Sequence, residues 1–121
     1  MAAPNIVGVT TITGKTNVLS VTTTATAVVT NSAASGLVYK VNALTVSNID
    51  GTNAADVTVD LFRGGVAYRI ATAITVPAAS TLVVVSKDVC LYLEEGDALR
   101  CTASANNDLQ AICSYEIIAD A

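Results

Sequence analysis

The side chains best suited to chemistry in this sequence gather in one short segment, Glu94-Glu95-Gly96-Asp97. Carboxylate oxygens are the ligands that a hard cation such as Ca²⁺ prefers, so one interpretation is a cation site. The competing interpretation is a solvated turn, in which Gly96 takes a positive φ and Asp97 accepts hydrogen bonds from its own backbone. No separate general acid is identifiable nearby, so hydrolysis by a carboxylate pair has no support. The sequence favours the turn.

A second polar group is formed by four closely spaced residues, Asn48, Asp50, Asn53 and Asp56. An EF-hand calcium loop needs a glycine at its sixth position and a bidentate glutamate at its twelfth. This stretch has neither residue at the required offset, and Asp50 followed by Gly51 is a common turn signal. The sequence therefore predicts a plain loop here.

The three cysteines, Cys90, Cys101 and Cys113, match no zinc or redox spacing. We expect residues 89–93 and 97–103 to form a hairpin around the acidic turn. The register that keeps the apolar faces of this hairpin together sends Cys90 and Cys101 to opposite faces, where they cannot form a disulfide. The sequence thus predicts three reduced, half-buried thiols and synthesis in a reducing compartment.

Composition excludes several classes of site. The sequence has no His and no Trp, which excludes Ser–His–Asp and Cys–His catalysis and His-ligated metals. Gly64-Gly65 belongs to no phosphate-binding fingerprint and predicts a turn. We expect the tyrosines to pack at the core edge and not to stack on sugars. They are Tyr39, Tyr68, Tyr92 and Tyr115. No catalytic, cofactor-binding or metal-binding residue is assigned.

Basic residues are few and scattered, and the formal net charge is −4, so nucleic-acid binding is not expected. The basic residues are Lys15, Lys40, Arg63, Arg69, Lys87 and Arg100. We interpret them as solubility charges or as partners of Asp56, Asp60 and Glu116. An alternative role for Lys40 or Arg63 is a contact with an acidic neighbouring subunit.

The elements that must position these residues are strands. Val (17 residues), Thr (16) and Ile (8) dominate the sequence, and turn residues separate short alternating runs. The pattern predicts one all-β domain over residues 1–121, an antiparallel, jelly-roll-like β-sandwich of about eight to ten short strands. A turn is expected at Gly14-Lys15, and Pro77 is expected to end a strand. The expected strands are 6–12, 17–21, 25–30, 37–48, 56–61, 66–76, 81–86, 89–93, 97–103 and 111–117.

The predicted surface is unusually neutral. Charged residues make up 13% of the chain, against a typical value of about 25%. Short uncharged side chains then fill the outward faces, which suits close packing in a symmetric assembly and predicts a homo-oligomer. We expect the neutral N-terminal residues 1–13 to form an arm that contacts neighbouring subunits.

No membrane or export segment is expected. The first five residues carry no basic side chain and no apolar stretch typical of a secretory signal. The longest apolar run, residues 89–93, is five residues, whereas a membrane-spanning helix needs about 20. The sequence therefore predicts a protein that is made in a cytoplasm and has no membrane partner.

Two parts of the sequence resemble small virion structural proteins of tailed phages, particularly marine and cyanobacterial ones. The first part, residues 37–59, contains the motif V-x-N-x-D-G at residues 46–51. The second part, residues 75–104, contains V-P-A at residues 76–78 and L-x-x-G-D-x-L at residues 93–99. The last motif also recurs in jelly-roll trimers, including tumour-necrosis-factor-like and complement-C1q-like domains. The resemblance implies a non-enzymatic, oligomeric β-sandwich component of a virion.

The leading hypothesis from this resemblance is a capsid decoration (cement) protein. It would form a trimer at junctions between major capsid protein subunits and would be located in the virion. The alternatives are a tail, neck or fibre-associated module, such as a ring or tube subunit, and a receptor- or glycan-binding jelly roll. No cofactor is expected for any of these roles.

Overall fold

The computed structural model describes residues 7–119. The described part is almost entirely β-structure, with one 3₁₀ turn, η1 (Lys87–Val89), as its only helix. The all-β prediction is therefore confirmed. The strands are β1 (Thr11–Val21), β2 (Thr26–Thr30), β3 (Val38–Asn48), β4 (Ala55–Arg63), β5 (Val66–Val76), β6 (Thr81–Val85), β7 (Leu91–Leu93), β8 (Ala98–Ala103) and β9 (Leu109–Ala119).

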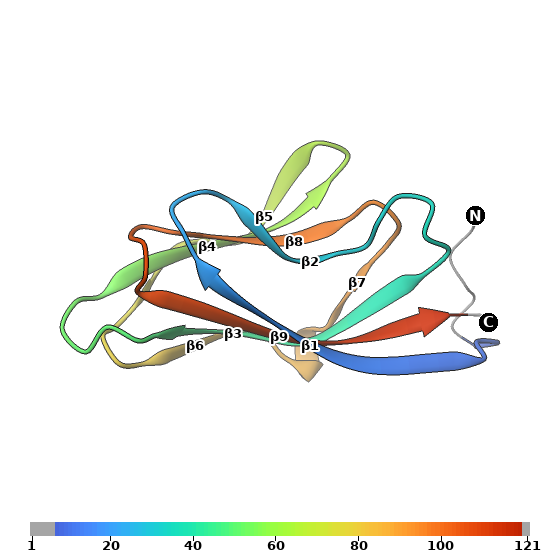
Figure 1. Ribbon diagram of the computed structural model, residues 1–121, viewed down its shortest axis with the longest axis horizontal. Coiled ribbons are helices and arrows are strands. Elements are labelled where there is room, and N and C mark those ends of the chain that lie inside the picture. Colours follow the sequence, from blue (N-terminus) through green and yellow to red (C-terminus); the bar gives the residue numbers. More distant parts are fainter. Residues whose placement is uncertain (1–6, 120–121) are drawn as a thin grey trace.

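The strands form two facing antiparallel sheets (Figure 1). Sheet A has the order β1-β9-β3-β6, and β7 also pairs with β3. Sheet B has the order β2-β8-β4-β5. The hairpin of β4 and β5 rises out of sheet B at the top of Figure 1. This arrangement is the β-sandwich that the spacing of the strands predicts.

The pairing of the strands is nested along the chain. The first strand pairs with the last, β2 pairs with β8, β3 pairs with β6, and β4 pairs with β5. One long antiparallel ribbon folded over into two layers produces this pattern, which is the winding of a jelly roll. Consequently each sheet contains strands from both ends of the sequence, and the first and last strands are neighbours.

Alternation of side chains along the strands builds the core between the sheets. In β3, Leu44 and Val46 are fully buried, whereas Thr45 and Ser47 point away from the core and stay partly exposed. Each such buried aliphatic side chain contributes about 1.5–3 kcal/mol to folding. The predicted strand at residues 37–48 agrees with β3, which at 11 residues has the same length as β1, β5 and β9.

Aromatic packing at the end of the core divides the tyrosines into two groups. Tyr39 and Tyr115 stack with their ring centroids 5.4 Å apart, and Tyr115 is buried. Tyr68 and Tyr92 are exposed by 55% and 39%. The prediction of core-edge packing therefore describes the first pair and is wrong for Tyr68, which lies in the protruding hairpin.

The beginning of the fold differs from the prediction. Gly14-Lys15 does not turn the chain, because both residues lie within β1 and pair with Glu116 and Tyr115 of β9. Residues 17–21 and 25–30 belong to different sheets, so the threonine cluster between them connects the two layers. Of the expected N-terminal arm, residues 1–6 lie outside the described residues, and residues 11–13 are part of β1.

The expected hairpin of residues 89–93 and 97–103 is also wrong. β7 pairs with β3 in sheet A, whereas β8 pairs with β2 and β4 in sheet B. The acidic turn therefore crosses from one sheet to the other. Leu93 and Leu99, on either side of this crossing, are both fully buried in the shared core. Burial of these two leucines from opposite layers explains why the strands separate instead of pairing.

Candidate interaction surface

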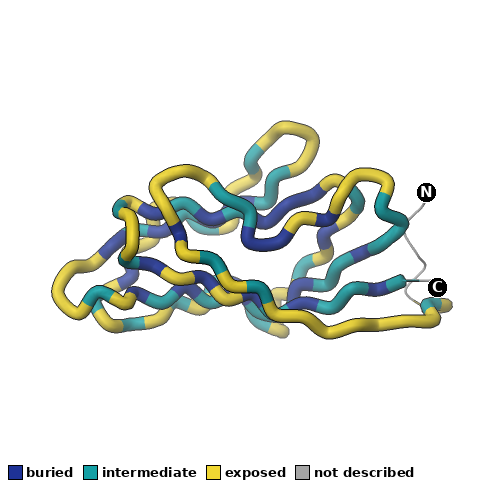
Figure 2. Tube along the Cα trace, in the orientation of Figure 1, coloured by how far each residue is buried: buried dark blue, intermediate teal, exposed yellow. Residues whose placement is uncertain are grey.

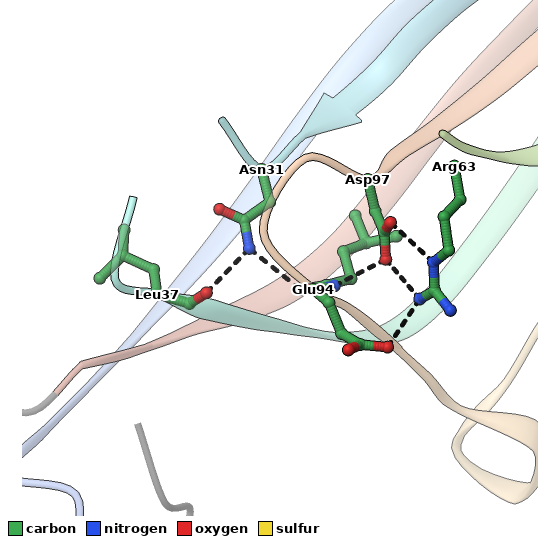
Figure 3. Close-up of polar contacts among 6 residues, drawn as sticks. Asn31, Leu37, Arg63, Glu94 and Asp97 are labelled. Carbon is green, nitrogen blue, oxygen red and sulfur yellow. Dashed lines mark hydrogen bonds and ion pairs between the residues drawn. The ribbon is translucent and has the colours of Figure 1, made fainter. Parts of the chain in front are cut away.

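The acidic turn is a network of hydrogen bonds (Figure 3). Gly96 has φ +88°, and the backbone N–H of Glu94 donates to the buried carboxylate of Asp97. Arg63, from the end of β4, donates to both oxygens of Asp97 at 2.8 and 2.5 Å and to Glu94 at 2.8 Å. The single guanidinium of Arg63 thus pairs with both carboxylates and balances one of their two charges. The turn prediction is confirmed, except that Asp97 is buried and not solvated. Arg63 forms this internal ion pair, and its contact with another subunit stays a prediction.

Electrostatics fix the charge state of this turn. Burial opposes ionisation of Asp97, but hydrogen bonds from Arg63 and from the Glu94 N–H outweigh it and hold the pKa of Asp97 below its usual value. The hydrogen bond to Asp97 likewise raises the pKa of Arg63. Within residues 7–119 no group of three or more His, Cys, Asp or Glu side chains is arranged to hold a metal ion.

A buried amide secures the same end of the sandwich. The side chain of Asn31 is fully buried and donates to the carbonyls of Leu37 and Leu93 at 2.9 and 3.0 Å, as Figure 3 shows for Leu37. Its oxygen accepts the hydroxyl hydrogen of Ser35 at 2.6 Å. Sequence reasoning placed Asn31 in an ordinary loop and missed this role. The available signal is a short amide directly after the apolar run of β2.

The second polar group is a loop, as predicted, and it contains a similar amide. Asn48 is buried and donates to the carbonyls of Asn53 and Val76. Asp50 accepts hydrogen bonds from the backbone of the following turn, chiefly from the Thr52 N–H, and these bonds lower the pKa of Asp50. The polar atoms are therefore occupied in holding the loop against β5.

A second ion pair, between Arg100 and Asp60, lies on the outer face of sheet B. Arg100 donates to Asp60 at 2.9 Å, and its guanidinium carbon lies 3.9 Å from the centre of the Phe62 ring. The predicted partnership of a basic residue with Asp60 is confirmed. Asp60 points outward in the alternation of β4, yet it is only 1% exposed. It is buried because the Arg100 side chain lies over it.

The cysteines differ in accessibility. Cys90 is exposed, whereas Cys101 and Cys113 are buried, and all three are free. Burial raises the pKa of Cys101 and of Cys113 to about 12, so neither forms a thiolate at neutral pH. The prediction of reduced thiols agrees with the structure. The prediction of half-burial is wrong for all three, because Cys101 and Cys113 are fully buried and Cys90, which follows the η1 turn, is exposed.

This difference predicts the labelling of the native protein. A thiol reagent such as 5,5′-dithiobis(2-nitrobenzoic acid) is expected to modify one cysteine per chain at pH 8 and all three in 6 M guanidinium chloride. The Cys90→Ser variant should then show no fast reaction in the native state. Rapid native labelling of Cys101 or Cys113, detected by peptide mass spectrometry, would contradict their burial.

The outer face of sheet A carries a continuous surface without charge. Its eleven outward side chains are uncharged, and they alternate with buried or partly buried residues along four paired strands. We call this surface the neutral face. It consists of Thr16, Val18 and Ser20 of β1, Gln110, Ile112 and Ser114 of β9, Ala43, Thr45 and Ser47 of β3, and Thr81 and Val83 of β6.

An apolar row crosses the neutral face from one edge to the other. Register places Val18 beside Ile112, Ile112 beside Thr45, and Thr45 beside Val83. The two valines at the edges are 75% and 59% exposed, and Ile112 is 43% exposed. A shallow hollow of about 400 Å³ lies between β1 and β9 along this row. The face can therefore pack against another flat surface but offers no catalytic group.

Polar residues limit the neutral face on one side. There Lys40 lies opposite Glu116 in the ladder, and with Asn42 and Lys87 these residues line a second hollow of about 320 Å³. Lys40 thus lies near an acidic residue of its own chain.

Within residues 7–119 no helix has the length and apolar character needed to cross a membrane.

Comparison with known proteins supports the fold. No protein-family model and no curated protein sequence matches the chain. A protein of the Bacillus endospore appendages, a family of disulfide-linked pili, is 16% identical over 92% of this chain and 90% of its own, with a TM-score of 0.52. At this identity the likeness concerns the fold alone.

Two further structures belong to a pentameric capsid protein isolated from metagenomic phage sequences. Each is 17% identical to this chain and covers 87% of it, with TM-scores of 0.44 and 0.43. This chain spans 62% and 64% of those capsid chains, which is less than two thirds of their length.

Proposed function

We propose that this chain is a non-enzymatic structural subunit of a virion, and specifically a capsid decoration protein. The observation that carries the proposal is the neutral face, because eleven uncharged outward side chains on one sheet suit burial against protein. The buried Asp97, Asn31 and Asn48 side chains and the buried thiols of Cys101 and Cys113 are occupied within the fold. The sequence motifs shared with small phage virion proteins supply the location, with the major capsid protein as partner and a trimer as the assembled form.

A decoration protein stabilises a capsid by adding buried area across subunit junctions. The compact sandwich is suited to this task, because its two layers are joined by buried amides at Asn31 and Asn48 and by the Arg63 ion pair. Flat, uncharged and closely packed surfaces gain from apolar burial and lose little side-chain entropy on binding.

Binding to capsids tests the proposal. The purified protein is expected to co-sediment with expanded capsids that lack it and to raise the temperature at which they release DNA. An Ile112→Lys variant, which places a charge in the middle of the neutral face, should bind at least about tenfold more weakly. A matched Thr102→Lys variant on sheet B should bind normally. Absence of wild-type binding would refute the decoration role.

A ring or tube subunit of a tail or neck is the second candidate. The observation that favours it is the fold shared with a pilus protein, since pili are built from repeated subunits. Symmetry separates the two roles, because a decoration protein follows the icosahedral shell and a tail subunit follows the tail axis.

A further inference from the structure

The two sheets protect their edges differently. β1 pairs with β9 over eleven consecutive residues with no register shift, has no proline, and carries one charge, Lys15. In sheet B, β5 shows two register shifts against β4 and a positive φ at Ala73, and β2 shows one shift against β8. Bulges and charges are the usual devices that prevent a free edge from pairing with another chain. Both edges of sheet B have bulges, whereas the β1 edge has none and carries only Lys15.

The β1 edge is also accessible. Its first six residues are all exposed, as the continuous yellow segment at the bottom of Figure 2 shows. Among the described strands β1 pairs with β9 alone, so alternate backbone N–H and C=O groups face away from the sheet. The opposite edge of sheet A, β6, pairs with β3 alone and contains no charged residue. Its one register shift against β3 lies between Val85 and Val83, so Thr81–Val83 keep a regular pairing.

We propose that a second copy of this chain adds its β6 to β1, head to tail, so that sheet A continues from one subunit into the next. The inference rests on the proposed function as a structural subunit and names the surface through which copies associate. Every pairing in sheet A is antiparallel, and β1 and β6 therefore run in opposite directions. A copy added at the edge continues this alternation without turning the sheet over.

The side chains match in the register that places Val18 opposite Val83 of the next copy. In this register Leu19 faces Leu82 on the core side, and Ser20 faces Thr81 on the neutral face. Leu19 and Leu82 are partly buried residues that pack against the core, so strand addition completes their burial. The apolar row then passes unbroken from subunit to subunit, and no charged side chains meet within these three pairs.

Pairing of β1 with β1 of a second copy would leave both β6 edges open. The head-to-tail arrangement instead covers both free edges of every subunit except those at the ends of a chain of copies. Such a heterologous contact closes into a ring or extends into a filament. The next copy is thus the occupant that covers both free edges of sheet A at once.

A charge-pair experiment tests this arrangement by sedimentation velocity. The Val18→Lys/Val83→Lys variant places like charges opposite each other in every head-to-tail contact, and its self-association is expected to weaken at least about tenfold. The Val18→Lys/Val83→Glu variant places opposite charges there and should associate like the wild type. If β1 paired with β1, both variants would weaken equally, which would overturn the proposal.

A matched control adds two lysines to sheet B, in the Ile70→Lys/Thr102→Lys variant, and should leave association unchanged. Far-UV circular dichroism and thermal melting verify that each variant is folded. A wild-type protein that stays monomeric at all concentrations contradicts the proposed contact, even where it binds capsids and the decoration role holds. Wild-type self-association without capsid binding would support the proposed contact and refute the decoration role.

Discussion

The Arg63→Ala variant is expected to lower the free energy of unfolding by about 2–3 kcal/mol at pH 7. The Asp97 carboxylate is 2% exposed, and without the guanidinium it keeps only the hydrogen bond from the Glu94 N–H. Breaking a buried ion pair costs about 3–5 kcal/mol. We reduce this figure because the Arg63 side chain is 45% exposed and partly screened by water. Urea denaturation measures the loss.

The control for this prediction is Glu94→Gln, which removes the exposed partner of the same guanidinium. The Glu94 side chain is 66% exposed, so its removal should change stability by less than about 0.5 kcal/mol. Equal effects of the two substitutions would show that the ion pair with Asp97 does not stabilise the turn.

The same ion pair predicts that the stability of the protein falls at acidic pH. The pKa of Asp97 is lower in the folded protein than the value of about 3.9 expected in the unfolded chain. The stability that Asp97 contributes is therefore fully present above about pH 4 and is lost as the pH falls through its folded pKa. The Asp97→Asn variant should start less stable at pH 7 and lose less stability than the wild type between about pH 4 and pH 2. Parallel loss in the two proteins would contradict this assignment.

The Asn31→Ala variant is the second substitution with a large expected effect, a loss of about 2–4 kcal/mol in the free energy of unfolding. Its side chain donates to the carbonyls of Leu37 and Leu93, and alanine leaves both carbonyls without this donor. An unsatisfied buried polar group costs about 1–3 kcal/mol. Thermal and urea unfolding measure the change.

Two further variants separate this mechanism from a simple loss of volume. Asn31→Asp keeps the shape but replaces the donor with a carboxylate that faces two carbonyls, so it should be at least as unstable as Asn31→Ala at pH 7. The matched control is Asn53→Ala, an exposed asparagine that contacts Asp50, with a change below about 0.5 kcal/mol. An Asn31→Asp protein as stable as the wild type would rule out the donor role.

Local alternation was sufficient to predict the class of fold. The run at residues 56–61 and the segment 44–47 of the strand at residues 37–48 place their apolar residues at every second position, which indicates a half-buried strand. The turns at Gly64-Gly65 and Gly96 also follow from local chemistry, because each of these glycines has a positive φ. Pro77 follows the last residue of β5, as expected.

Local alternation does not predict which strands pair when they are distant in the sequence. The two strands that flank Glu94–Asp97 look like a hairpin locally, yet they belong to opposite sheets because the nested winding separates them. Gly14 resembles a turn residue, but pairing with β9 keeps it in an extended strand. Asn31 and Asp60 look like solvent-exposed residues, and their burial depends on partners 62 and 40 positions away.

For the neutral face, the composition predicts only that uncharged residues lie on the surface, and it does not predict which ones lie together. A low content of charged residues indicates neutral faces, but the register between strands decides which neutral residues share a face. Val18, Ile112 and Val83 come from three distant segments, and only the paired strands bring them into one row. The sequence accordingly predicts an oligomer with a contact through residues 1–13, and it does not identify the neutral face.

The location of the protein in an intact particle tests the central claim most directly. Cryo-electron microscopy with symmetry-resolved density tests whether the sandwich of β1–β9 is part of a virion and where it lies there. The decoration role predicts density repeated over the icosahedral shell, at junctions between major capsid subunits and with the neutral face covered by protein. Density confined to the tail axis, or absent from the particle, would contradict that role.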